Sequence, residues 1–264
     1  MTPTPFSLDG KTAIVTGGGT GIGKSIALEL ARAGADVAVC SRKLEHLEPV
    51  VAEIQKLGRR AFAAGVDVRV EAQVQGMVER AAREWGRLDV MVNNAGASFR
   101  ARPEDISLNG WNAVVGINLG GVFLGCKWAY RQMKAQGGGV IINVASIAGV
   151  YGASMMSHYG AAKAAVINLT RALGVTWARD GVRVNCIAPG PVETEGYRDV
   201  LRRTDPENAE KTYRAVAARV ALGRWGRVEE IAYPCVFLAS DASSFMTGAT
   251  IVVDGGPPPR DAEG

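Results

Sequence analysis

A tyrosine and a lysine four residues apart, Tyr159 and Lys163, have the chemistry of an acid/base pair. Residues at positions i and i+4 share one face of a helix, so the ammonium group would lie one turn from the phenol. A free tyrosine has a pKa of about 10, and a nearby cation favours the tyrosinate. Lowering this pKa by about 3 units requires roughly 4 kcal/mol, which cations in a partly dry cleft can supply. On an arbitrary helix, however, such a pair is usually a feature of the exposed surface.

A glycine-rich segment, TGGGTGIG, follows an apolar run and precedes a helical pattern. Without side chains at Gly17, Gly21 and Gly23, the backbone can turn sharply and approach a pyrophosphate closely. The N-terminus of the helix then offers free N–H groups and a partial positive charge to the phosphates. The spacing is G-x3-G-x-G, and glycines also serve ordinary tight turns. Its position between a strand and a helix favours a nucleotide-binding turn.

The end of the second predicted strand indicates which nicotinamide cofactor would bind. Binding of NAD usually places an acidic residue there to hold the ribose 2′-OH. This strand ends at Ser41 and Arg42, and Asp36 lies at its other end. Ser41 and Arg42 can instead hold a 2′-phosphate by charge-assisted hydrogen bonds, which predicts NADP(H). Arg42 as a solvated residue is the alternative, and NAD(H) stays open because Thr20 adds no second cation.

The elements that would position these residues alternate along the chain. Seven short apolar runs are predicted strands, at 12–16, 36–40, 61–66, 88–93, 139–144, 182–187 and 250–254. They are nearly continuous in Val, Ile and Ala, as in parallel strands buried on both faces. Amphipathic helical patterns lie between them, at 22–33, 43–57, 71–85, 107–136, 157–180 and 229–240. The alternation predicts an α/β fold, a single doubly wound domain over residues 1–264.

Further motifs stand in order along this framework. They are Asn93-Asn94-Ala95-Gly96 after the fourth strand, Asn118, Ser146 thirteen residues before Tyr159, Lys163, Pro189-Gly190, Thr194 and the DGG at 254–256. From Lys11 to Gly256 the chain resembles the short-chain dehydrogenase/reductase family. The resemblance implies a Rossmann-type, seven-stranded parallel sheet of order 3-2-1-4-5-6-7 with helices on both faces.

The resemblance also implies catalytic roles. Tyr159 would be the acid/base, aided by Lys163 and by the positive ring of an oxidised nicotinamide. Ser146 would hydrogen-bond the substrate oxygen, and Lys163 would also reach the nicotinamide ribose. Asn118 would position a water that links Lys163 to solvent, with a simple capping role as the alternative.

The residues expected to bind the cofactor follow from the same resemblance. They are Gly17, Gly19, Thr20, Gly21, Ile22, Gly23, Ser41, Arg42, Asp67, Val68, Asn94, Ala95, Gly96, Tyr159, Lys163, Pro189, Gly190, Val192 and Thr194. Asp67 and Val68 would contact the adenine, although Asp67 as a turn residue is an alternative. Pro189, Gly190, Val192 and Thr194 would cover the nicotinamide.

The charged segment 191–221 contains no predicted strand and is interpreted as a substrate lid. Arg198, Arg202 and Arg203 could meet a phosphate of CoA or of a carrier protein there, although such residues are more often solvated. His158 is interpreted as a structural residue or a pocket wall, and His46 as a solvated residue.

These features predict an NADP(H)-dependent oxidoreductase acting on a carbonyl or alcohol, including a 3-oxoacyl thioester. An enoyl- or dienoyl-CoA reductase acting on a C=C bond is the alternative, because the SRKLE and APGPVETEG stretches are similar to those enzymes. A non-catalytic module that senses NADP(H) is less favoured, since it would tolerate loss of Ser146, Tyr159 or Lys163.

The composition of the chain indicates which kinds of binding partner to expect. The net charge of +4 is spread along the 264 residues, which argues against nucleic acid as a partner. The four cysteines lack metal-ligand spacing, so we expect buried free thiols, no metal and a reducing, cytoplasmic location. No secretory signal or run of about 18 apolar residues is found, so no membrane contact is expected. The remaining partners are a small-molecule substrate and, by the resemblance, further copies of the chain in a dimer or tetramer.

Overall fold

The chain folds around a seven-stranded, all-parallel sheet, seen in a computed structural model that describes residues 4–194, 196–197 and 206–257. The strand order is β3-β2-β1-β4-β5-β6-β7, which confirms the predicted order. The strands are β1 (Thr12–Thr16), β2 (Asp36–Ser41), β3 (Ala61–Gly65), β4 (Val90–Asn93), β5 (Gly139–Val144), β6 (Val182–Pro189) and β7 (Thr250–Val253). The order reverses direction at β1 and β4, so ligands are expected at the carboxyl edge beside this pair.

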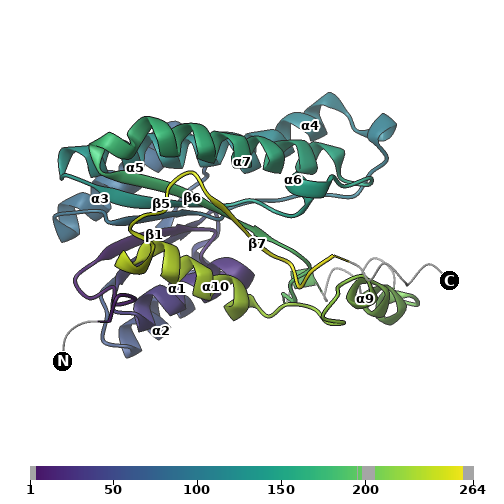
Figure 1. Cartoon of the computed structure of the whole chain (residues 1–264), viewed down its shortest axis with the longest axis horizontal. Coiled ribbons are helices and arrows are strands. Elements are labelled where there is room, and N and C mark those ends of the chain that lie inside the picture. Colours follow the sequence, from purple (N-terminus) through teal and green to yellow (C-terminus); the bar gives the residue numbers. More distant parts are fainter. Residues whose placement is uncertain (1–3, 195, 198–205, 258–264) are drawn as a thin grey trace.

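Helices cover both faces of the sheet (Figure 1), with α1, α2 and α10 on one side and α3, α5 and α7 on the other. The helices are α1 (Gly21–Arg32), α2 (Glu48–Lys56), α3 (Glu71–Trp85), α4 (Leu108–Val115), α5 (Gly121–Ala135), α6 (Ala148–Tyr151), α7 (Ser157–Trp177), α9 (Ala209–Ala218) and α10 (Val228–Ala239). In Figure 1, α9 projects beyond the end of the sheet.

Strand side chains alternate between two hydrophobic cores. In β1, Ala13 and Val15 pack toward α1 and α10, whereas Ile14 packs toward α3 and α5. Every residue of β1 is buried. A strand enclosed on both faces has no position for a polar, solvent-facing side chain, which explains the continuous apolar runs of the sequence.

Two long predicted helices are interrupted in the structure. The 43–57 pattern divides into a 3₁₀ turn (Leu44–His46) and α2, because Pro49 is tolerated only in the first turn of a helix. The 107–136 pattern divides into α4, a π-helical turn (Gly116–Gly120) and α5. A π-turn inserts an extra residue and redirects the side chains around it, often at functional sites.

The continuous helical stretch Leu108–Ala135 is long and apolar enough, by length and composition, to cross a membrane. Helices that pack in a protein core meet the same criterion. In α5 the residues Val122, Cys126, Ala129 and Met133 are buried in the core beneath the sheet. All four cysteines are buried free thiols, as expected from the sequence.

Candidate active site

The predicted catalytic residues meet at the carboxyl edge of the sheet. Ser146 follows β5, while Tyr159 and Lys163 lie in the first two turns of α7. All three line one cavity of about 410 Å³. Ile22, Asn94, Gly96, Pro189, Gly190 and Val192, which the sequence assigned to the cofactor, line the same cavity. The fold therefore places the acid/base pair beside the predicted nicotinamide position.

Burial sets the protonation of the tyrosine and the lysine. It raises the pKa of Tyr159 above its ordinary value, and the hydrogen bond with the side chain of Ser146 opposes this shift. The sequence predicted a lowered pKa, but desolvation of the enclosed phenol outweighs the stabilisation of its anion here. Tyr159 is therefore a phenol at neutral pH, which suits a proton donor.

Lys163 is almost fully enclosed, with 2 % of its surface exposed. Its Nζ donates a hydrogen bond to the Val144 carbonyl oxygen at 2.7 Å and lies 5.6 Å from the centre of the Tyr159 ring. Desolvation lowers the pKa of Lys163 to about 8, so most of these side chains still carry a proton at pH 7.

Asn118 is fully buried in the π-helical turn. Its Nδ2 donates to the carbonyl oxygens of Ala97 (2.6 Å) and Val114 (2.9 Å), whereas Oδ1 is buried with no hydrogen-bond partner. A Cβ built on Gly96 would lie 2.6 Å from this Oδ1 and 3.6 Å from Lys163 Nζ. The glycine thus keeps a small space between an unpaired acceptor and an ammonium group, a setting that favours a bridging water.

The glycine turn has the geometry expected for phosphate binding. Gly17 and Gly21 adopt φ values of 66° and 52°, which favour glycine. A Cβ on Gly23 would overlap the Gly17 carbonyl oxygen, and no side chain caps the first turn of α1. Asn94 ties the turn to β4 by donating from Nδ2 to the Thr16 carbonyl oxygen at 2.9 Å. The bare turn and the uncapped helix fit a pyrophosphate.

A second cavity of about 260 Å³ continues from this turn toward the end of β2. It is lined by Gly17, Thr20, Cys40, Ser41, Arg42, Lys43, His46, Val66, Val68, Ala95, Gly96 and Ile117. None of these lining residues is acidic. Arg42 forms no ion pair within the described parts of the chain, so its charge is available to an anion.

Several predicted cofactor residues do not line either cavity. Gly19, Gly21, Gly23 and Thr194 line neither of the two cavities, and the Thr194 side chain packs against Gly21. Asp67 is turned toward Arg69, with 2.6 Å between Oδ2 and Nη2, and this pairing lowers its pKa to about 2. Arg198, Arg202 and Arg203 of the predicted lid lie outside the described residues.

Some lining residues were missed by the sequence interpretation. Lys43 and His46 line the second cavity, although His46 was expected to be only solvated. Trp225 lines the catalytic cavity from beyond the predicted lid. The sequence signal for Lys43 and His46 is their position shortly after β2, and the signal for Trp225 is its position shortly after segment 191–221. His158 is fully buried against Phe99, with ring centres 4.4 Å apart, and it lines neither of these cavities, which fits the structural interpretation.

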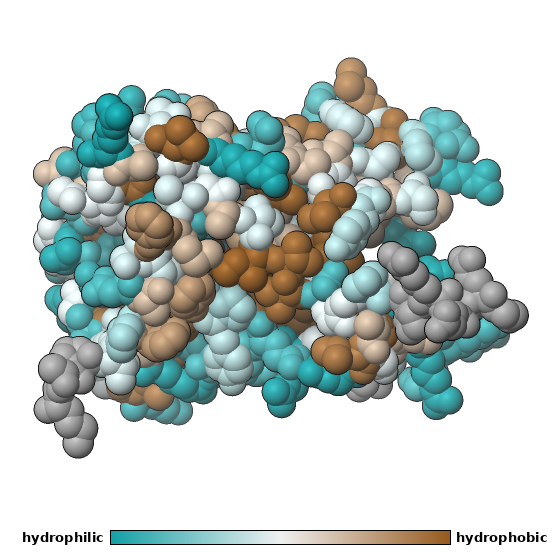
Figure 2. Space-filling model, in the orientation of Figure 1, coloured by the Kyte–Doolittle hydropathy of each residue, from teal (hydrophilic) through white to brown (hydrophobic). Residues whose placement is uncertain are grey.

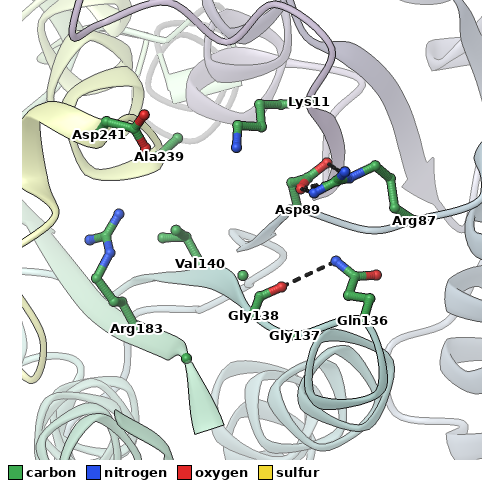
Figure 3. Close-up of a pocket in the computed structure, with 12 residues that line it drawn as sticks. Lys11, Arg87, Asp89, Gln136, Gly137, Gly138, Val140, Arg183, Ala239 and Asp241 are labelled. Atoms are coloured by element: carbon green, nitrogen blue, oxygen red, sulfur yellow. Dashed lines mark hydrogen bonds and ion pairs between the residues drawn. The ribbon is translucent and has the colours of Figure 1, made fainter. Parts of the chain in front are cut away.

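A third cavity, of about 260 Å³, lies at the opposite, amino edge of the sheet (Figure 3). Three of its charged side chains, those of Arg87, Asp89 and Arg183, have structural partners. Arg87 is paired with Asp89, which also accepts a hydrogen bond from the Thr12 backbone N–H. Arg183 donates to three backbone carbonyl oxygens: that of Leu238 in the last turn of α10, and those of Ser240 and Met246, which follow the helix. None of the residues that line this cavity belongs to the predicted catalytic or cofactor-binding set.

Comparison with known proteins agrees with this site. A family model described as enoyl-(acyl carrier protein) reductase matches residues 17–257. The chain is 42% identical over 247 residues to cis-4-hydroxycyclohexanecarboxylate dehydrogenase of Sinomonas cyclohexanicum. The match covers 93% of this chain and 96% of that enzyme.

Two solved structures are similar throughout. A short-chain type dehydrogenase/reductase from Mycobacterium marinum has a TM-score of 0.87 and 40% identity, covering 95% of this chain and 96% of that one. A putative NAD(P)-dependent gluconate 5-dehydrogenase from Beutenbergia cavernae, with NADP bound at low occupancy, has a TM-score of 0.87 and 41% identity. That match covers 96% of this chain and 98% of the other.

Proposed function

The chain belongs to the short-chain dehydrogenase/reductase family, and we propose that it transfers a hydride between NADP(H) and a carbonyl or alcohol substrate. The observation that carries this proposal is that Ser146, Tyr159 and Lys163 line one cavity with the predicted nicotinamide-contacting residues. A bound nicotinamide supplies or accepts the hydride at the reacting substrate carbon.

The residues of the chain manage the proton and the substrate oxygen. In the reductive direction Tyr159 donates its proton to the carbonyl oxygen while Ser146 hydrogen-bonds the same oxygen. A ketone, NADPH and one proton thereby become a secondary alcohol and NADP⁺. The Lys163 ammonium stabilises the tyrosinate left behind, and the space between Lys163 and Asn118 lets a water return the proton.

NADP(H) is proposed over NAD(H) because of the cavity at the end of β2. Ser41, Arg42, Lys43 and His46 line it, and none of its lining residues is an acid that would hold a free ribose 2′-OH. A guanidinium binds a phosphate by charge-assisted hydrogen bonds. We expect the 2′-phosphate to lie against Arg42.

Reduction of an enoyl or dienoyl thioester is the second candidate, favoured by the description of the matching family model. Tyr159 and Ser146 would then polarise the thioester carbonyl, and the hydride would add to the carbon of the C=C bond that is farther from this carbonyl. A panel of ketones, 3-oxoacyl thioesters and enoyl thioesters, assayed by NADPH oxidation, distinguishes the two reactions. A non-catalytic sensing module would bind NADPH and consume none of the panel.

Replacement of the tyrosine tests the mechanism. We expect Tyr159→Phe to lower kcat by about 10²- to 10⁴-fold, because the proton donor is lost, while the variant still binds NADPH. Turnover that survives this substitution intact would contradict Tyr159 as the acid/base.

We also propose that segment 191–221 contacts the substrate, since Pro191, Val192 and Tyr197 line the catalytic cavity.

Self-association into a dimer or tetramer is inferred from the exposed hydrophobic surface. Figure 2 shows hydrophobic residues gathered over edge strand β7, and Val175 and Phe245 are largely exposed. Light scattering at micromolar concentration tests this, and a monomer would contradict it. Four free thiols suit a reducing compartment such as the cytoplasm.

A further inference from the structure

Three aromatic rings pack together beside the catalytic cavity, and two of them line it. The Trp225 ring is stacked on Tyr213, with centres 4.9 Å apart and planes 15° apart. Tyr197 meets Trp225 at the same centre-to-centre distance with planes tilted by 47°. We call these three residues the aromatic corner. Tyr197 and Trp225 line the cavity itself, together with Met156.

The aromatic corner is held from three segments of the chain. Trp225 Nε1 donates to the Tyr213 carbonyl oxygen at 3.0 Å, and Tyr213 Oη donates to Glu193 at 2.9 Å. A short parallel bridge joins Val192 to Gly226: the Glu193 N–H donates to the Gly226 carbonyl oxygen, and the Gly226 N–H donates to the Pro191 carbonyl oxygen. The indole N–H of Trp225 is its only hydrogen-bond donor and is already bonded to Tyr213, so the part of the ring that lines the cavity is apolar. The ring is only 7% exposed, and the packing around it fixes its orientation.

The charges of the residues that line the cavity indicate the charge of the substrate. Among the described residues that line it, Lys163 is the only charged side chain, and it lies at the catalytic end. A carboxylate or phosphate placed against the aromatic corner would lose its hydration without gaining a cation from those residues. The cavity of about 410 Å³ must also hold the nicotinamide, which leaves room for a compact substrate.

We propose that the substrate is a neutral ring compound, an alicyclic secondary alcohol or its ketone, whose oxygen meets Tyr159 and whose ring packs on Trp225 and Tyr197. Rigid flat surfaces contact a ring without the loss of rotamer freedom that ordering a flexible chain requires. Trp225 is thus a specificity-determining residue. This assignment rests on the proposed hydride transfer, and it goes further by naming what the enzyme selects.

The test compares a cyclic and a linear ketone of equal carbon number with a charged ring and a thioester. Cyclohexanone, 2-hexanone, 4-oxocyclohexanecarboxylate and an acetoacetyl thioester are reduced by the wild-type enzyme with NADPH, and kcat/KM is measured for each. We expect cyclohexanone to exceed both 2-hexanone and the carboxylate by about tenfold or more. Equal or higher kcat/KM for the linear ketone or the thioester overturns the ring assignment, and equal or higher kcat/KM for the charged ring overturns the assignment of a neutral substrate; either result leaves the proposed hydride transfer intact.

Variants then locate the selectivity. Trp225→Ala should lower kcat/KM for cyclohexanone by about tenfold to a hundredfold and that for 2-hexanone by less than about threefold. Trp225→Phe keeps a flat ring and should retain most of the preference, and Tyr197→Ala, at a partly exposed position, should reduce it without unfolding the protein. Equal losses for both ketones in all three variants would make the aromatic corner merely structural and overturn the proposal.

Binding separates failure of the two proposals. If the wild-type enzyme consumes no NADPH with any carbonyl or enoyl compound, the proposed function is wrong. Calorimetric titration of cyclohexanol and 2-hexanol into the protein with NADP⁺ then decides the ring assignment on its own. Tighter binding of the ring, lost in Trp225→Ala, supports it, whereas equal or absent binding of both alcohols refutes it.

Discussion

Replacement of Gly96 by alanine tests whether the space between Asn118 and Lys163 matters. Gly96 has no positive φ, so its backbone accepts an alanine, and the effect must come from the added Cβ. That atom would lie 2.6 Å from Asn118 Oδ1, whereas ordinary van der Waals contact begins at 3.4 Å. Asn118 cannot yield freely, because its Nδ2 is held by the Ala97 and Val114 carbonyl oxygens.

The expected cost follows from this overlap. Overpacking at an enclosed site typically lowers the free energy of unfolding by about 1–3 kcal/mol. For a chain of this size that corresponds to a fall in Tm of roughly 2–12 °C. The same Cβ would lie 3.6 Å from Lys163 Nζ, in the space proposed for the bridging water. A catalytic group misplaced by about 1 Å can cost 10²-fold in rate, so we expect kcat/KM to fall by about tenfold to a hundredfold.

Gly76→Ala is the matched control. Gly76 lies within α3 with nothing within 4 Å of an added Cβ, so alanine should raise the free energy of unfolding by about 0.5–1 kcal/mol through helix propensity. Chemical unfolding in urea and NADPH-linked turnover are measured for both variants. If Gly96→Ala unfolds and turns over like Gly76→Ala, the reasoning about the enclosed space is refuted.

Three further outcomes are expected. Arg42→Ala should raise the KM for NADPH by about tenfold or more and leave the KM for NADH nearly unchanged; a parallel rise in both would argue against a 2′-phosphate contact. Gly23→Ala should abolish measurable NADPH binding in a fluorescence titration while the far-UV spectrum is retained, because its Cβ overlaps the Gly17 carbonyl oxygen. Lys163, with a folded-state pKa of about 8 against an ordinary 10.5, binds fewer protons folded than unfolded between these values. We therefore expect the free energy of unfolding in urea, taken as the wild-type value minus that of Lys163→Met, to rise by up to about 3 kcal/mol between pH 8 and 10.5 and to stay constant below pH 7. A difference that is constant at every pH would contradict the burial of this charge.

Local pattern was enough to predict the framework. The predicted strands 12–16 and 139–144 coincide with β1 and β5, and the predicted helix 71–85 coincides with α3. A strand buried on both faces must be apolar throughout, and an amphipathic helix must repeat its apolar residues every turn. The resemblance carried by the order of motifs likewise predicted that Ser146, Tyr159 and Lys163 share one site, and the three residues line one cavity.

The sequence by itself thus determined the alternation of strands and helices and the position of the glycine turn, since each depends on residue type and short-range spacing, and the resemblance carried by its ordered motifs predicted the acid/base pair. Only the tertiary structure decided the environment of those groups. The direction of the Tyr159 pKa shift depends on how completely other segments enclose the phenol. The burial of Asn118 in the π-helical turn and the packing of the aromatic corner around Trp225 are tertiary features that no local sequence pattern predicted.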